Sequence, residues 1–331
     1  MGKTYNSLGG LMKSLFGRRS AIVTVVIAAA LILSGCSKSV NDSAGGASGD
    51  CGSYAIAMHA WGGYTASAQV VAEVAKQELG CTITQTTLEE GPVTYDAMEA
   101  GTIDVVIEDW GGGRWKDWTD RGAVVEAGEN GNIGIIGMYV APWMVEKYPD
   151  IVDSKNLNKY AALFKTADSG GKGAWFEGPT GYTTIGEKMV SANKLNFKVI
   201  FSGSEAALVD GFLKAEENKT PFIGYAWQPW TLHSKLPTLE AARVKFPAND
   251  WSDPAAASGL TDYPSTPLLK LISKKLNDAN DPFTSLVKNF KWTNADQNGV
   301  AADLENGMSA EEAASKWIAA NAATVASWVG K

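Results

Sequence analysis

The chain has 331 residues, of which 45% are hydrophobic and 10% aromatic, and its formal net charge is −7. This length is sufficient for two lobes with separate hydrophobic cores. The acidic excess argues against a nucleic-acid partner, because nucleic-acid binding depends on Lys and Arg side chains that neutralise phosphates.

The N-terminal region has the pattern of a bacterial lipoprotein signal. Four basic residues and no acidic residue precede an apolar run over 21–33, which ends just before Cys36. A basic segment, a short apolar core and small residues before a cleavage point are typical of a secretory signal. An uncleaved anchor is the alternative, but the run is short for a span of roughly 20 residues. We therefore predict that residues 1–35 are removed, that Cys36 is lipidated, and that the protein is held outside the cytoplasm by its acyl chains.

The segment after the signal is small and polar. Residues 37–50 consist mainly of Ser, Gly, Ala, Asn and Asp, a composition typical of a flexible linker. We predict that residues 36–51 form a tether between lipid and fold. Removal of the four basic residues of the signal also changes the formal net charge from −7 to −11.

The first predicted unit is a strand, a helix and a strand. Residues 54–59 and 82–88 have strand patterns, and 65–79 has apolar residues at helical spacing. In a right-handed βαβ unit the two strands start at the same end of the sheet, where Cys51 and Cys81 lie. An even pair of cysteines in an oxidising compartment favours a disulfide between them. Two buried free thiols are the alternative.

The rest of the chain alternates between strand-like and helical patterns, which indicates an α/β fold. We expect strands at 104–107, 133–140, 174–176, 197–201, 221–227 and, less regularly, 242–246. We expect helices at 93–100, 142–147, 159–165, 184–193, 204–218, 267–276 and 309–329. The interpretation is two lobes, one from 52–140 plus 241–331 and one from 141–240, which close like a hinge around a ligand.

Little in the sequence indicates catalysis or a metal. His59 and His233 are the only histidines. Two histidines are few for a histidine-based active site or a metal cluster, so neither is favoured. The adjacent acids Glu89/Glu90 and Glu108/Asp109 are not an acid/base pair, because neighbours on a strand point to opposite faces. We predict no cofactor and no enzymatic activity, with an extracytoplasmic hydrolase as the less favoured alternative.

Tryptophans at the ends of strands are the most informative feature of the mature chain. Trp61, Trp110 and Trp227 follow or end predicted strands, and in open α/β sheets ligands bind beyond the carboxyl ends of strands. Aromatic faces that converge on a pocket favour a quaternary ammonium, with up to about 2 kcal/mol from each desolvated ring. A sugar site would also use aromatic platforms, but it would normally add several Asp, Asn and Arg side chains, and these strand ends offer few of them.

At this point the chain resembles the substrate-binding lipoproteins of glycine betaine/choline-type ABC importers. The likeness covers most of 52–250, and four segments carry it: the signal ending in Leu33-Ser34-Gly35-Cys36, then 95–110, 195–208 and 224–230. The resemblance implies the two-lobed periplasmic-binding-protein fold, type II-like, with an aromatic cage in the cleft. It also implies a monomer that passes a compatible solute to a membrane permease. Ectoine, an amino-acid derivative or a sugar remain alternative ligands.

The resemblance also implies roles for individual residues. Trp227 looks like the tryptophan of the family's Trp-x-Pro-His motif, and Trp61 looks like the ring after the first strand. Trp175 or Tyr182 looks like the ring from the second lobe. Further candidates for ligand contact are Trp110, Trp230, His59 and Tyr64, followed by Trp143, Glu108, Asp109, Glu177 and His233.

The sequence departs from the family motif at Trp230, which stands where the motif has a His that can hold a ligand carboxylate. Either His59, His233 or backbone N–H groups replace that His, or the ligand lacks a carboxylate, as choline does. In the second case Glu108, Asp109 or Glu177 would face the cation.

Overall fold

The structure is a computed structural model that describes residues 51–249 and 257–331. The predicted signal peptide, the predicted lipidation site Cys36 and the predicted tether before Cys51 lie outside the described residues. Among the helices that are described, none is both long enough and apolar enough to cross a membrane.

The described strands form one continuous sheet in the order β2-β1-β3-β8-β4-β7-β5-β6. Their bounds are β1 (Ser53–Met58), β2 (Thr82–Thr87), β3 (Val105–Asp109), β4 (Val124–Val140), β5 (Gly173–Glu177), β6 (Phe197–Phe201), β7 (Ile223–Gln228) and β8 (Thr266–Ser273). β1 pairs in parallel with β2 and β3, and β5 pairs in parallel with β6 and β7. The predicted α/β class is therefore confirmed.

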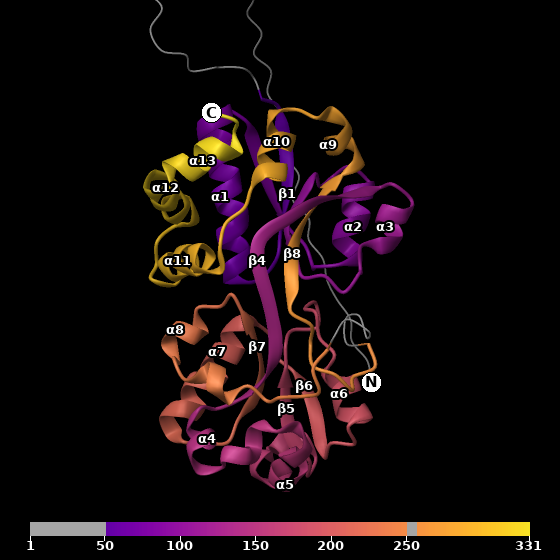
Figure 1. Ribbon diagram of the computed structural model, residues 1–331, viewed down its shortest axis with the longest axis vertical. Helices are drawn as coiled ribbons and strands as arrows, with labels where there is room; N and C mark the ends of the chain where they lie inside the picture. The colour runs from indigo at the N-terminus through magenta and orange to yellow at the C-terminus, as the bar shows by residue number, and fades with distance from the viewer. Residues whose placement is uncertain (1–50, 250–256) are drawn as a thin grey trace, which may run out of the picture. The chain divides into compact units, whose positions relative to one another are not determined.

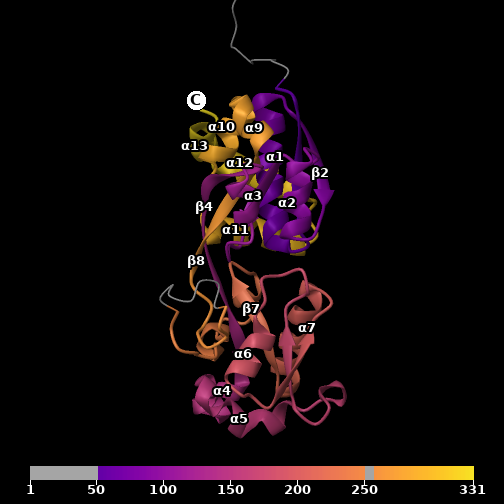
Figure 2. The ribbon, with the colours of Figure 1, turned by 90° about the vertical axis from the view of Figure 1, so that its right-hand side faces the viewer.

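The long strand β4 joins the two halves of this sheet. It pairs with β8 through Gly134 and with β7 from Ile135 onward. β1, β2, β3 and β8 lie on one side of this change of partner and form lobe 1, whereas β5, β6 and β7 form lobe 2 (Figures 1 and 2). β4 belongs to both lobes, so no single residue number divides them there.

Helices cover both groups of strands. Those of lobe 1 are α1 (Gly62–Leu79), α2 (Pro92–Glu99), α3 (Lys116–Asp120), α9 (Lys274–Ala279), α10 (Pro282–Asn289), α11 (Asn294–Glu305), α12 (Ala310–Ala320) and α13 (Ala322–Trp328). Those of lobe 2 are α4 (Trp143–Lys147), α5 (Leu157–Tyr160), α6 (Gly186–Ala192), α7 (Glu205–Asn218) and α8 (Leu232–Lys235), with short 3₁₀ turns among them. α1 is the central helix of lobe 1 and packs against α10, α11 and α12.

Local sequence signals explain several helix ends. Gly80 adopts a left-handed conformation (φ 72°) and ends α1, which a glycine does without steric cost. The side chains of Thr293 and Ser309 cap α11 and α12 in capping boxes with Asp296 and Glu312. Asn321 separates α12 from α13, so the helical stretch predicted over 309–329 consists of two helices.

The helix predicted over 267–276 is wrong, because Thr266–Ser273 is strand β8 and α9 begins at Lys274. β8 lies between β3 and β4, and Leu268, Leu271 and Ile272 are fully buried there. A strand buried on both faces has a continuous apolar run that periodicity cannot distinguish from a buried helix. The buried Lys270 breaks even that run, and its Nζ donates to the carbonyls of Lys288 and Phe290.

Two further differences concern strands. β4 begins at Val124 rather than at 133, because Gly128 and Gly131 occur at irregularities in its pairing with β8 and make 124–132 look like a loop. The strand predicted over 242–246 does not form. Arg243 and Lys245 make only isolated bridges there.

Cys51 and Cys81 form a disulfide with a Cα–Cα distance of 4.5 Å. They flank the start of the parallel pair β1 and β2, where Ser53 is opposite Thr82.

Candidate functional site

A cavity with about 250 Å³ of empty volume, part of it open to solvent, lies where the carboxyl ends of strands from both lobes meet. The first lobe contributes residues after β1, β2 and β3, and the second lobe contributes β7 and the loop after β5. The cavity is lined by Trp61, Glu90, Trp110, Tyr182, Thr183, Tyr225 and Trp227. Five of the seven are aromatic, so the cavity has apolar walls and few polar groups.

A single buried carboxylate holds the two tryptophans of the first lobe. The Nε1 atoms of Trp61 and Trp110 both donate to Oε1 of Glu108, at 3.1 and 2.8 Å. Oε2 of Glu108 accepts from the Ser67 hydroxyl at 2.9 Å. Glu108 is fully buried, and burial raises the pKa of its carboxyl above the ordinary value, although these hydrogen bonds oppose the rise. Glu108 therefore fixes the orientation of two cavity walls and does not line the cavity itself.

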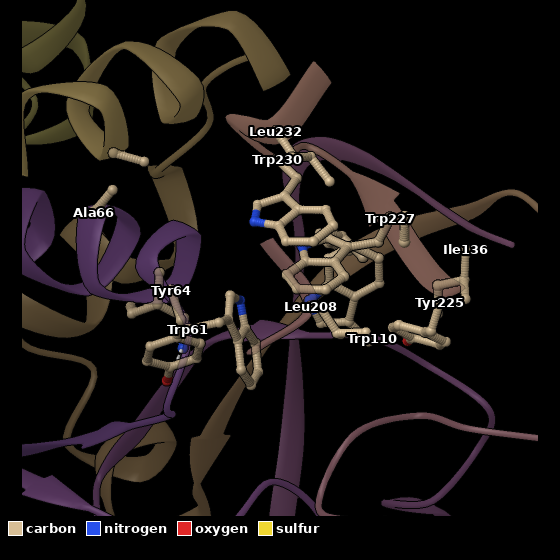
Figure 3. Close-up of a cluster of buried hydrophobic side chains, with 14 of the residues drawn as sticks. Trp61, Tyr64, Ala66, Trp110, Ile136, Leu208, Tyr225, Trp227, Trp230 and Leu232 are labelled. Carbon is tan, nitrogen blue, oxygen red and sulfur yellow. Dashed lines mark hydrogen bonds between the residues drawn. The ribbon is translucent and has the colours of Figure 1, made fainter. Parts of the chain in front are cut away.

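The walls from the second lobe are aromatic rings in mutual contact. The rings of Trp227 and Trp230 are stacked at 3.9 Å with an interplanar angle of 9° (Figure 3). Tyr182 lies edge-on to Trp227 at 5.7 Å and edge-on to Trp61 of the other lobe at 5.4 Å. The Tyr182 hydroxyl also donates to the carbonyl of Ala60 at 3.0 Å. Tyr182 thus connects the aromatic walls of the two lobes.

The polar side of the cavity is an acid paired with an arginine. Glu90 Oε1 lies 2.6 Å from Nη2 of Arg114 and accepts from the backbone N–H of Trp110 at 3.2 Å. Asp109 lies behind it and accepts from the hydroxyl of Tyr95 at 2.5 Å. Burial first, and then the charge of Glu90, raise the pKa of Asp109 to about 7. Glu90 is the only carboxylate that reaches the cavity among the residues that the structure describes.

Four of the residues singled out from the sequence line the cavity: Trp61, Trp110, Tyr182 and Trp227. The other candidates from the first lobe are buried behind them. His59 stacks on Trp61, and its Nδ1 lies 3.0 Å from the Leu88 carbonyl. The Tyr64 hydroxyl accepts from the backbone N–H of Ile107.

The other candidates from the second lobe also lie outside the cavity lining. Trp175 and Glu177 are buried in the core of this lobe, where the indole N–H donates to the carboxylate at 3.2 Å. Nε1 of Trp143 donates to the carbonyl of Thr220. His233 lies 3.0 Å from the Trp227 carbonyl through Nε2, and Trp230 supports the Trp227 ring from behind.

Sequence reasoning missed three cavity residues. Glu90 was not predicted as a site residue, yet it lines the cavity, is 8% exposed and is ion-paired with Arg114. Tyr225 is a strand residue whose hydroxyl donates to the Thr183 carbonyl at 3.0 Å. The Thr183 hydroxyl oxygen is buried and has no hydrogen-bond partner in the described part of the chain. The one usable signal was that Glu90 directly follows a strand end, as Trp61 and Trp110 do.

The described residues contain no group of three or more His, Cys, Asp and Glu side chains that could hold a metal ion. The chemistry of the cavity is therefore that of aromatic faces, one paired carboxylate and one free hydroxyl. Such an arrangement can bind a small cation with a methylated surface through cation–π attraction.

Two relatives of known role are similar in sequence. The trimethylamine N-oxide-binding protein of Pelagibacter ubique is 25% identical over 284 residues, which cover 80% of this chain and 87% of the relative. The glycine betaine/carnitine transport binding protein GbuC of Listeria monocytogenes is 28% identical over 127 residues, or 38% of each chain.

Two solved structures share the fold. Lactococcal OpuAC, in a closed-liganded conformation complexed with glycine betaine, superimposes with a TM-score of 0.65 at 19% identity, covering 84% of this chain and 99% of that one. An ABC-transporter choline binding protein in complex with choline gives 0.69 at 17% identity, covering 85% and 92%. These matches confirm the predicted two-lobed periplasmic-binding-protein fold.

A family model matches residues 52–320, which is nearly all of the described chain. The model is that of the substrate binding domain of ABC-type glycine betaine transport systems. The chain therefore belongs to this family of substrate-binding proteins.

Proposed function

We propose that the cavity between the lobes binds a methylated ammonium compatible solute and that the protein delivers it to the permease of an ABC importer. The observation that carries the proposal is the aromatic lining: rings from both lobes line one cavity, and Glu90 lines it with them. The relatives' names support it, since they record binding of trimethylamine N-oxide and transport of glycine betaine and carnitine.

The cation–π energies expected from the cavity rings account for most of the free energy of micromolar binding. Trp61, Trp110 and Trp227 are each less than a tenth exposed, so a cation between them meets desolvated rings. At up to about 2 kcal/mol a ring, three rings supply about 6 kcal/mol. A micromolar Kd needs about 8 kcal/mol, and Glu90 and apolar burial of the methyl groups contribute the remainder and offset the ordering costs.

The direct test is a calorimetric panel of trimethylamine N-oxide, choline, glycine betaine, carnitine, ectoine and a sugar. We expect binding of at least one methylated ammonium compound. Binding of the sugar alone would contradict the proposal. A bound ligand should also be recovered unchanged after incubation, since we propose a binding protein without catalytic turnover.

A pair of tryptophan variants tests the site. Trp227→Ala removes a cavity wall, so we expect an affinity loss of about 30-fold, from about 2 kcal/mol of cation–π energy. Trp143→Ala is the matched control, because its indole bonds to Thr220 outside the cavity. Equal losses of affinity in the two variants would show that the ligand does not bind in this cavity.

We further propose that the protein is lipid-anchored at Cys36, which would keep the captured solute beside its permease. Support comes from the sequence pattern before Cys36. In cells, Cys36→Ala should abolish incorporation of a labelled fatty acid and move the protein out of the membrane fraction. Unchanged labelling would exclude this cysteine.

A further inference from the structure

A second acid, outside the cavity lining, bridges the lobes next to the cavity. Glu205 begins α7 in lobe 2, and its Oε2 accepts from the backbone N–H of Gly62 in lobe 1 at 2.9 Å. Gly62 is the first residue of α1 and directly follows the cavity residue Trp61. The carboxylate of one lobe is thus bonded to the helix N-terminus of the other.

This N-terminus has no anion of its own. α1 has 18 residues, no acidic residue in its first turn, and no side-chain hydrogen bond from its N-cap Trp61. The first N–H groups of a helix lack intrahelical partners and carry partial positive charge, so they favour an anion. In this chain Glu205 supplies that anion.

The charge of Glu205 also acts on the cavity. Burial first, and then the charges of Glu205 and Glu90, raise the pKa of the Tyr182 hydroxyl above its ordinary value. The Tyr182 wall of the cavity therefore lies in the electrostatic field of two carboxylates. The nearby guanidinium of Arg114 is paired with Glu90. The unpartnered polar group in the lining is the Thr183 hydroxyl, which is neutral.

From these contacts we propose that Glu205 determines ligand class: it occupies the anion position at α1, so that the cavity selects methylated ammonium compounds without a carboxylate over betaines. This inference rests on the proposed function. A ligand carboxylate beside Trp61 would find the adjacent N-terminus of α1 already bonded to Glu205 and would be repelled by Glu205 and Glu90. A ligand with a single oxygen and no carboxylate, namely the hydroxyl of choline or the N-oxide oxygen of trimethylamine N-oxide, needs only one hydrogen-bonding group such as the Thr183 hydroxyl.

Glu205 is not the only contact between the lobes, so its replacement should leave them able to close. Lys235 of α8 lies 2.7 Å from Glu305 of α11, and the Thr231 hydroxyl donates to the same carboxylate. This second contact provides the control: Glu305 is also an acid between the lobes, but it does not bond to α1.

The experiment measures Kd for choline, trimethylamine N-oxide and glycine betaine in the wild type, Glu205→Ala and Glu305→Gln. In the wild type we expect one of the carboxylate-free ligands to bind at least tenfold more tightly than glycine betaine. Glu205→Ala should reduce that ratio at least tenfold, since the α1 N-terminus becomes free for the ligand carboxylate. Glu305→Gln should change all affinities by a similar factor and keep the ratio.

The outcomes separate the two proposals. Tighter binding of glycine betaine by the wild type, or an unchanged ratio in a folded Glu205→Ala variant, would overturn the role of Glu205 and leave the proposed function intact. No binding of any methylated ammonium compound would overturn the proposed function and this inference with it. If the alanine variant does not fold, Glu205→Gln replaces it: the amide can keep the bond to Gly62 but carries no charge, so the ratio should fall because repulsion of the ligand carboxylate is removed.

Discussion

The carboxylate of Glu108 offers the sharpest test of how the cavity walls are held. Its Oε1 accepts from both Trp61 and Trp110, so Glu108→Ala leaves two buried indole N–H groups without an acceptor. An unsatisfied buried donor costs about 1–3 kcal/mol, which gives about 2–6 kcal/mol for the two. At about 2 °C for each kcal/mol in a domain of this size, Tm should fall by roughly 4–12 °C.

Affinity should fall with stability in this variant, because two rings lose their fixed orientation toward the ligand. Each ring contributes up to about 2 kcal/mol when its face is aligned with the cation, and the two together up to about 4 kcal/mol. Loss of half of that total corresponds to about a 30-fold change in Kd. Isothermal titration calorimetry with the tightest ligand of the panel, combined with thermal unfolding of the unliganded protein, measures both effects.

Glu108→Gln is the matched control. The amide oxygen can keep both indole bonds, and the amide N–H₂ can donate to Ser67, whose hydroxyl already lies 3.1 Å from the Gly63 carbonyl. We expect affinity and Tm close to those of the wild type. If Glu108→Gln binds as weakly as Glu108→Ala, the negative charge of Glu108 attracts the ligand, and our assignment of a purely positioning role is wrong.

The other predictions concern stability. Replacement of Cys51 and Cys81 by Ser should destabilise the fold by about 3–4 kcal/mol in the chain-entropy model, because their disulfide closes a separation of 30 residues. Denaturant unfolding measures this loss, and an unchanged midpoint would show that the bridge is dispensable. Burial raises the pKa of Glu177 from an ordinary 4.5 to about 7, so its contribution to stability is present below pH 4.5 and is lost as the pH rises through 7. Glu177→Gln should remove about 2–3 kcal/mol of the stability difference between pH 5 and pH 8, and an identical pH profile in both proteins would contradict this.

The strand-end rule predicted much of the cavity from the sequence. Trp61, Trp110 and Trp227 follow or end strands whose carboxyl ends meet in one region, and all three line the cavity. The rule works because parallel strands in an open α/β sheet present their carboxyl ends at the same edge. It needs only the correct identification of strands, which the apolar runs provided at these three places.

The rule fails for residues within a strand. Trp175 and Glu177 alternate with Phe176 in β5, and both turn toward the core of lobe 2, whereas Tyr225 in β7 turns toward the cavity. Successive side chains point to opposite faces, but the sequence does not show which face is which when both are apolar. Glu90 presents the same difficulty, because its partner Arg114 is distant in sequence and their pairing depends on the folded loops.

At Gly134, the strand that connects the two lobes lies against a wall of the cavity. It is the last residue of β4 that pairs with β8, and Ile135 already pairs with β7 of the other lobe. A Cβ atom at this position would lie 2.8 Å from Cζ3 of Trp110 and 2.7 Å from Cδ2 of Leu268, closer than real Cβ contacts. The absent side chain therefore makes room for a cavity wall at the point where the strand changes partners.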